Sequence, residues 1–324
     1  MSSAIATTVA VAIFTGGALA AVYLGDSMNN EDLPDIGNSA GASDTTPAIQ
    51  ARLPNEKQAL ILEKAKIVLI GRCMKRLGVD FSPEPAINPV FLSLWEGGGL
   101  QPLTEGNASK YGYHPAPLNA GDKADGQPAD SPASKGASGG SRQLKQWERD
   151  AVYGDRDQVN GKPVPDGGCF GESQREIFKS TDRLVGDTGN LKGKALRTET
   201  DVLNAMLELF AVAGDRVSND PRYKQVINQW SLCMNKAGHE EYRHITDAAL
   251  SSKWQETASA TKEEKEVATA DARCRKTTNY SSIYRALNGA YQEQVASEHK
   301  QFLSSWSSNL ATRLGNAQRV LRNT

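Results

Sequence analysis

Four cysteines are the residues of this sequence whose chemistry is best constrained by their spacing. They are Cys73, Cys169, Cys233 and Cys274, and no two of them form a C-x-x-C pair. Zinc sites and thiol redox sites usually place cysteines close together in sequence, so those roles are the less favoured alternative. An even number of widely spaced cysteines indicates structural disulfides, and four cysteines allow three pairings.

A repeated segment favours one of these pairings. Residues 71–81 read GRCMKRLGVDF and residues 231–242 read SLCMNKAGHEEY. Both contain Cys-Met, a basic residue three positions after the cysteine and a glycine five positions after it. We interpret this as an internal duplication in which each copy ends a helix, and a second cysteine then begins another helical stretch. If each copy closes on itself, Cys73 pairs with Cys169 and Cys233 pairs with Cys274.

Other candidate catalytic groups have spacings that argue against chemistry. His239 and His244 are five residues apart, whereas the H-E-x-x-H zinc motif needs four to place both imidazoles on one helical face. Glu172 and Glu176 lie at helical spacing, which is more typical of an exposed helix face than of a glycosidase carboxylate pair. Because the nucleophile-elbow and phosphate-loop motifs are also missing from the sequence, we predict no catalytic, cofactor-binding or metal-binding residues.

One loop has the composition of a recognition surface. Residues 110–117 read KYGYHPAP, and aromatic side chains on loops often serve in binding. The candidate recognition residues are therefore Tyr111, Tyr113 and His114, although such side chains also anchor loops to a core.

The N-terminal region predicts export. Residues 4–24 are uncharged over a length that could span a bilayer, and an A-x-A site at Ala18–Ala20 could instead be cleaved as part of a signal peptide. A buried helix of a soluble protein is a third reading. The following flank is acidic, with no Lys or Arg before Arg52, so we expect residues 1–25 to be a signal or anchor segment and the body to lie outside the cytoplasm. Residues 26–51 have the polar, acidic composition of a flexible linker.

The remaining chain, residues 52–324, is predicted to be one all-α, disulfide-stapled domain. Apolar residues recur every three or four positions after Asn55, and Thr198, Asp220 and Thr261 are helix N-cap signals. We expect two related helix-Cys-Gly elements and one or two long helices between Thr261 and Leu321. Long irregular loops are also expected, chiefly a Gly/Pro/Ser-rich loop at residues 104–141. The formal net charge of -1 makes nucleic acid an unlikely partner.

Several segments resemble a group of actinobacterial exported proteins that have no assigned function. The segments that carry the likeness are CMKRLGVDFSP, KYGYHPAP, GGCFGES, LCMNKAG and DARCRKTTN, and they cover most of the chain from about Arg52 onward. This chain departs from the pattern by one extra residue between Gly238 and Tyr242. The resemblance implies a cell-envelope setting and supplies no catalytic residues. We therefore expect a non-enzymatic envelope protein that binds a partner protein or wall polymer, with a cell-wall hydrolase or a transporter accessory or sensor subunit as alternatives.

Overall fold

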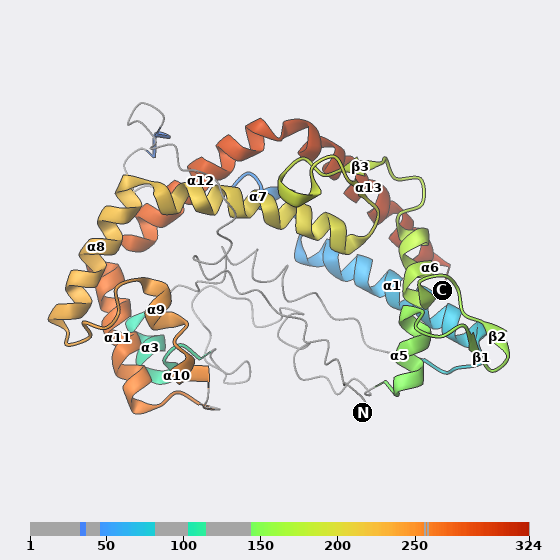
Figure 1. Ribbon diagram of the computed structural model, residues 1–324, viewed down its shortest axis with the longest axis horizontal. Helices are drawn as coiled ribbons and strands as arrows, with labels where there is room; N and C mark the ends of the chain where they lie inside the picture. The colour runs from blue at the N-terminus through green and yellow to red at the C-terminus, as the bar shows by residue number, and fades with distance from the viewer. Residues whose placement is uncertain are drawn as a thin grey trace. The chain divides into compact units, whose positions relative to one another are not determined.

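The computed structural model describes residues 33–36, 46–81, 103–114, 144–255, 257 and 259–323 (Figure 1). The predicted signal or anchor segment, residues 4–24, lies outside these ranges, as does most of the predicted linker. The chain forms two compact units, and each has its own disulfide. Unit 1 takes its described residues mainly from 103–114 and 212–292, and unit 2 takes them from 48–81, 144–211 and 293–323.

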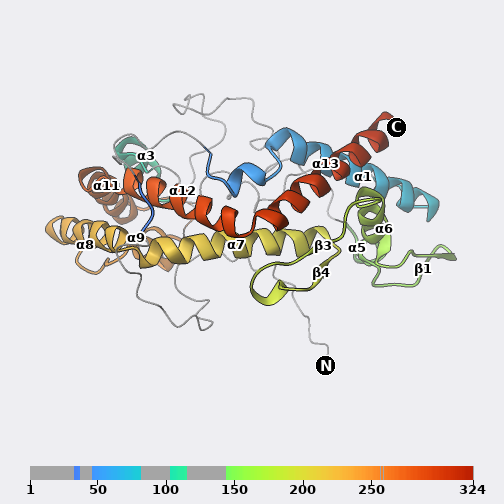
Figure 2. The ribbon, with the colours of Figure 1, turned by 90° about the horizontal axis from the view of Figure 1, so that it is seen from above.

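Helix α1 (Glu56–Arg76) is the centre of unit 2. It begins at Asn55, whose side chain accepts a hydrogen bond from the Gln58 backbone while the Gln58 side chain accepts one from the Asn55 backbone. This reciprocal capping satisfies two backbone donors that a helix start would otherwise leave unpaired. Helix α1 packs against α13 (Lys300–Arg322), α6 (Gly168–Ile177) and α5 (Gln146–Tyr153), as Figure 2 shows for its long contact with α13.

Strand structure in the described residues is limited to two short antiparallel pairs in unit 2. In the first, β1 (Gln158–Val159) pairs with β2 (Lys162–Pro163), and in the second, β3 (Leu184–Val185) pairs with β4 (Ala195–Leu196). Two short 3-10 turns, η3 (Gln50–Arg52) and η4 (Gly189–Leu191), also belong to this unit. The predicted all-α fold class is confirmed.

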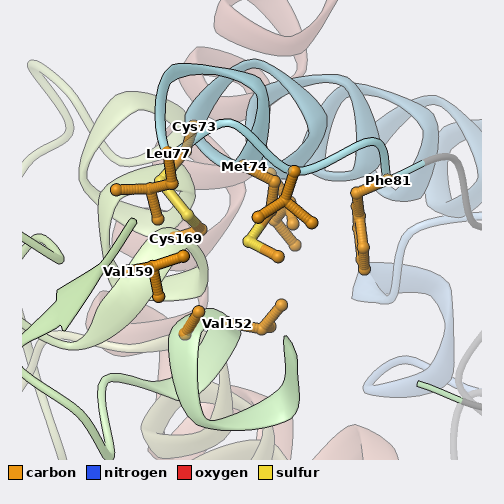
Figure 3. Packing of buried hydrophobic residues seen from close by; sticks show 10 residues of the cluster. Cys73, Met74, Leu77, Phe81, Val152, Val159 and Cys169 are labelled. Atoms are coloured by element: carbon orange, nitrogen blue, oxygen red, sulfur yellow. A yellow bond between two sulfur atoms is a disulfide. The ribbon is translucent and has the colours of Figure 1, made fainter. Parts of the chain in front are cut away.

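A disulfide lies within the hydrophobic cluster of unit 2. Cys73 on α1 is bonded to Cys169 on α6, and both are fully buried. Figure 3 shows Met74, Leu77 and Val159 gathered around this bond. The pairing ties the end of α1 to the start of α6, so the staple and the apolar packing reinforce the same contact.

Unit 1 is built around helix α11 (Lys262–Thr277). Helix α11 packs against α3 (Glu105–Tyr111), α8 (Pro221–Lys236) and α9 (Ile245–Ala249), and Cys233 of α8 is bonded to Cys274 of α11. The short helix α10 (Ser252–Gln255) and most of α12 (Tyr280–Glu298) complete the unit, while α7 (Glu199–Asn219) and α12 each contain a boundary between the units. Both predicted pairings are therefore confirmed.

The two helix-Cys-Gly elements end in the same way. After Cys73, the Val79 amide donates to the Met74 carbonyl, and after Cys233 the His239 amide donates to the Met234 carbonyl. Gly78 and Gly238 both have positive φ, which glycine adopts at little cost. The likeness ends at the second cysteine: Cys169 lies at the start of α6, but Cys274 lies near the end of α11, so the prediction that it begins a helix is wrong.

Two further sequence predictions are corrected. The region from Thr261 to Leu321 forms three helices, α11, α12 and α13, because Asn279 takes a left-handed conformation with φ of 54° and His299 interrupts the chain between α12 and α13. The long C-terminal helix itself is confirmed as α13. The range predicted as an irregular loop, 104–141, contains helix α3, which begins at Thr104 with a side-chain cap to Asn107.

Candidate functional site

A groove lies on the surface of unit 2. Its volume is about 740 Å³, within the usual size range of ligand sites. One wall comes from η3 and the start of α1, and the other comes from the end of α12 and from α13. The lining residues are Ala48, Ala51, Arg52, Leu53, Gln58, Glu293, Ala296, Ser297, Lys300, Ser307, Leu310, Ala311 and Leu314.

Two hydrogen bonds hold the walls of the groove together. The indole nitrogen of Trp306 donates to the Arg52 carbonyl at 2.8 Å, and the Arg52 guanidinium donates to the Ser307 hydroxyl at 3.3 Å. Trp306 is 2% exposed, so it anchors η3 from inside the unit. The buried side chains of Ile49 and Leu53 hold the same turn against the core. These contacts fix both walls of the groove.

Unit 2 also contains a cluster of partly buried charges from three helices. Glu199 of α7 pairs with Lys66 of α1 at 2.8 Å and with Arg313 of α13 at 3.3 Å. Lys66 also pairs with Glu63 at 2.6 Å. Arg313 is stacked over Phe178, with its guanidinium carbon 4.3 Å from the ring centroid. Through Arg313, which does not line the groove, these contacts hold α13 to α7 and α1.

The pKa values of Glu63 and Glu199 are shifted in opposite directions by their surroundings. Burial raises the pKa of Glu63 despite its contact with Lys66. Burial also acts on Glu199, but the nearby Lys66 and Arg313 outweigh it and hold the pKa of Glu199 below its usual value. Opposed shifts of this kind occur in acid-base sites. The cavity beside this cluster has a volume of only about 10 Å³, which is close to the minimum for one water molecule, so a sugar ring has no room there.

A second buried network lies in unit 1 and is centred on Asp271. Its carboxylate accepts hydrogen bonds from the Trp230 indole at 2.8 Å, from the Arg275 guanidinium at 2.7 Å, and from the Tyr113 hydroxyl at 3.0 Å. Asp271 has no exposed surface and Arg275 is 6% exposed. The network joins α8, α11 and the segment after α3, which is a structural role.

The predicted recognition residues are placed against α11 in unit 1. His114 contacts Glu264 at 2.8 Å through Nδ1 and the Thr257 carbonyl at 2.9 Å through Nε2. The Tyr113 amide donates to the same Glu264 oxygen, and its ring stacks on Trp254. Burial raises the pKa of Tyr113. Both side chains are partly buried contacts with their own unit. Tyr111, also partly buried, lies in the last turn of α3 and not in a loop as predicted. The part of all three in recognition stays a prediction.

Two residues from the motifs with unfavourable spacing, His244 and Glu172, have structural contacts. His244 caps α9 by accepting a hydrogen bond from the Thr246 amide, and its other ring nitrogen contacts the Tyr223 hydroxyl at 3.1 Å. Glu172 forms an ion pair with Arg76 across α6 and α1. In the ranges that the structure describes, no group of three or more His, Cys, Asp or Glu side chains could hold a metal ion.

Comparisons with known protein families, with curated proteins and with solved structures found no match. None of the helices formed by the described residues combines the length and the apolar composition needed to cross a membrane. The groove was missed at the sequence level, although its signal is present. Lys300, Ser307 and Leu314 of α13 recur every seven residues, which places them on one helical stripe.

Proposed function

We propose that this chain is a non-enzymatic protein of the cell envelope that binds a partner protein through the groove of unit 2. The observation that carries the proposal is the groove itself, which is preformed, about 740 Å³ in volume and lined by Leu53, Leu310 and Leu314 among small residues. The lining mixes these leucines with polar and charged side chains, a combination that suits an amphipathic helix of another protein.

The disulfides support the extracytoplasmic part of the proposal. Cys73–Cys169 and Cys233–Cys274 account for all four cysteines, and such bonds persist in oxidising compartments rather than in the cytosol. Whether residues 4–24 anchor the protein or are removed as a signal peptide is part of the proposal, as is its membership of the actinobacterial exported group. Cleavage near Ala20 predicts a secreted protein, and retention predicts an anchored one.

Photo-cross-linking in the native envelope tests this function. A leucine-sized diazirine amino acid at Ala311, which is exposed in the groove, fills far less of it than Trp would and should yield one dominant protein adduct. The same probe at Gln318, an exposed position of α13 outside the groove, is the matched control. The partner identified from the adduct should rebind the purified wild-type chain and not an Ala311→Trp variant. Equal labelling from Ala311 and Gln318 would contradict a partner site in the groove.

A further inference from the structure

The partner segment itself can be specified from the lining of the groove. We infer that the groove receives an amphipathic helix of a partner protein whose acidic residues meet Lys300 and Arg52. The inference rests on the proposed function and deepens it by naming the chemistry of the partner. Three features of the described residues carry it: the spacing of the lining residues, their size and the charges at the rim.

The spacing of the lining residues fits a helix. From α12 into α13 the lining positions are Glu293, Lys300, Ser307 and Leu314, with Ala296, Ser297, Leu310 and Ala311 between them. On α13, Lys300, Ser307 and Leu314 follow a heptad pattern, in which a facing helix inserts its own side chains between successive turns. The lining portion of α13, from Lys300 to Leu314, is roughly 21 Å long, enough for about four turns of a partner helix.

The size of the lining side chains allows a close approach. Ala48, Ala51, Ala296, Ser297, Ser307 and Ala311 project little from their backbones, while the leucines supply an apolar floor. A bulky facing side chain can therefore enter between them and bury apolar surface, as ridges of one helix enter the grooves of another. A partner helix with leucine at heptad spacing matches this surface.

The positive charges of Lys300 and Arg52 at the rim of the groove favour a partner helix with acidic side chains. Lys300 is exposed and makes no hydrogen bond or ion pair with the described residues. Arg52 is also exposed and uses one guanidinium nitrogen on Ser307, which leaves its other donors for a ligand. Glu293, near the end of α12, is the single acidic side chain of the lining. Acidic side chains on the partner are therefore favoured beside Lys300 and Arg52 and disfavoured beside Glu293.

Synthetic peptides of defined sequence test this inference on the full-length protein. The probe is an 18-residue helix with Leu at heptad positions and Glu on one flank, and its control has Lys in place of every Glu. Titration calorimetry should show that the acidic peptide binds the wild-type chain at least 10-fold more tightly than the basic one. Lys300→Glu should reverse this order, and Glu293→Gln should leave the acidic peptide bound at least as tightly.

Two groove variants separate binding at this site from binding elsewhere. Ala311→Trp fills the groove from an exposed position and should abolish binding, whereas Gln318→Trp on the same helix should not. Equal affinity for the two peptides, or binding unchanged by Ala311→Trp, would overturn the inference. Two other results would also overturn it. The first is a concentration-dependent dimer that Ala311→Trp abolishes, because the groove would then bind a second copy of the chain. The second is binding of dodecanoate when neither peptide binds, because the groove would then bind an acyl chain. A partner adduct at Ala311 without any preference for acidic peptides would overturn the charge assignment alone and leave the proposed function standing.

Discussion

At the residue scale, the hydrogen-bond partners of His114 indicate its protonation state. Both of its ring nitrogens face acceptors, the Glu264 carboxylate and the Thr257 carbonyl. A neutral imidazole can donate from only one nitrogen, so the pair of contacts favours the charged ring. The hydrogen bond to Thr257 and then that to Glu264 raise the pKa of His114, and these outweigh the opposing effect of burial.

A pH dependence of stability follows for His114. Because its pKa is higher in the folded chain than in the unfolded chain, its stabilising effect is complete below about pH 6.5 and is lost as the pH rises through the folded pKa. We measure the free energy of unfolding of wild type and His114→Gln from pH 5 to 9. The difference between the two should shrink as the pH rises.

The comparison with His114→Gln is needed because another histidine has the opposite effect. Burial lowers the pKa of His244 in the folded chain. The unfolded chain therefore binds a proton at this residue more readily, and the free energy of unfolding falls as the pH falls. His244 is unchanged in both proteins, so it cancels in the difference. A difference that stays constant with pH, or grows as the pH rises, would show that His114 is not charged in the folded chain.

Asp271 gives a second prediction at this scale. Asp271→Asn removes the charge that balances the buried Arg275, and a buried charge without its counter-ion is strongly unfavourable. We expect the free energy of unfolding to fall by about 3 to 5 kcal/mol in denaturant titrations. The control is Glu105→Gln, which breaks the exposed pair with Arg273 and should cost less than about 1 kcal/mol. Similar losses of unfolding free energy in Asp271→Asn and Glu105→Gln would show that burial does not make the Asp271–Arg275 pair more important than an exposed one.

At the scale of elements, the helix starts were predictable because their signals are local. Thr261 and Asp220 cap α11 and α8 with their side chains, as their positions in the sequence predict, and the Thr198 hydroxyl accepts a hydrogen bond from the Asp201 amide. Such caps need only a few neighbouring residues. The left-handed Asn279 that separates α11 from α12 has no comparable signal, because apolar spacing continues on both sides of it.

Features that depend on distant residues were not predictable in the same way. The segment with Tyr113 and His114 contacts α11 through Glu264 and Asp271, which are about 150 residues further along the chain. The groove likewise needs η3 to lie beside α13, through Trp306 and Arg52. Periodicity shows that a face exists, but only the packed unit shows which face remains uncovered.

The disulfide of unit 1 is the element-scale prediction. The bond between Cys233 and Cys274 closes a loop with a sequence separation of 41 residues and ties α8 to α11. The double variant Cys233→Ala/Cys274→Ala should lose about 2 to 5 kcal/mol of unfolding free energy, because its unfolded state is less restricted. Thermal unfolding of the non-reduced proteins measures this loss. The same measurement is repeated with reductant. Any further loss of stability in the double variant should then come from reduction of Cys73–Cys169, its one remaining disulfide.

At the scale of the whole molecule, the two disulfides connect the location of the protein to its stability. Their loops span sequence separations of 96 and 41 residues, for which chain entropy predicts about 4 to 5 kcal/mol each. Since each unit has one disulfide, about 4 to 5 kcal/mol per unit compares with a total folding stability of about 5 to 15 kcal/mol for an ordinary domain. A chain with four free thiols would therefore keep little stability.

This comparison predicts where the folded protein accumulates. Cells of the native host are fractionated, and free thiols are alkylated with a mass tag before any reduction. The chain in the envelope or medium should carry no tag, and chain held in the cytosol should carry four tags and be degraded by added protease at a far lower dose. Full-length protein that is untagged in the cytosol, or fully tagged yet equally protease-resistant, would contradict the dependence on an oxidising compartment. The protease arm is decisive because the expected loss of about 4 to 5 kcal/mol in each unit raises the unfolded population of that unit by about three orders of magnitude.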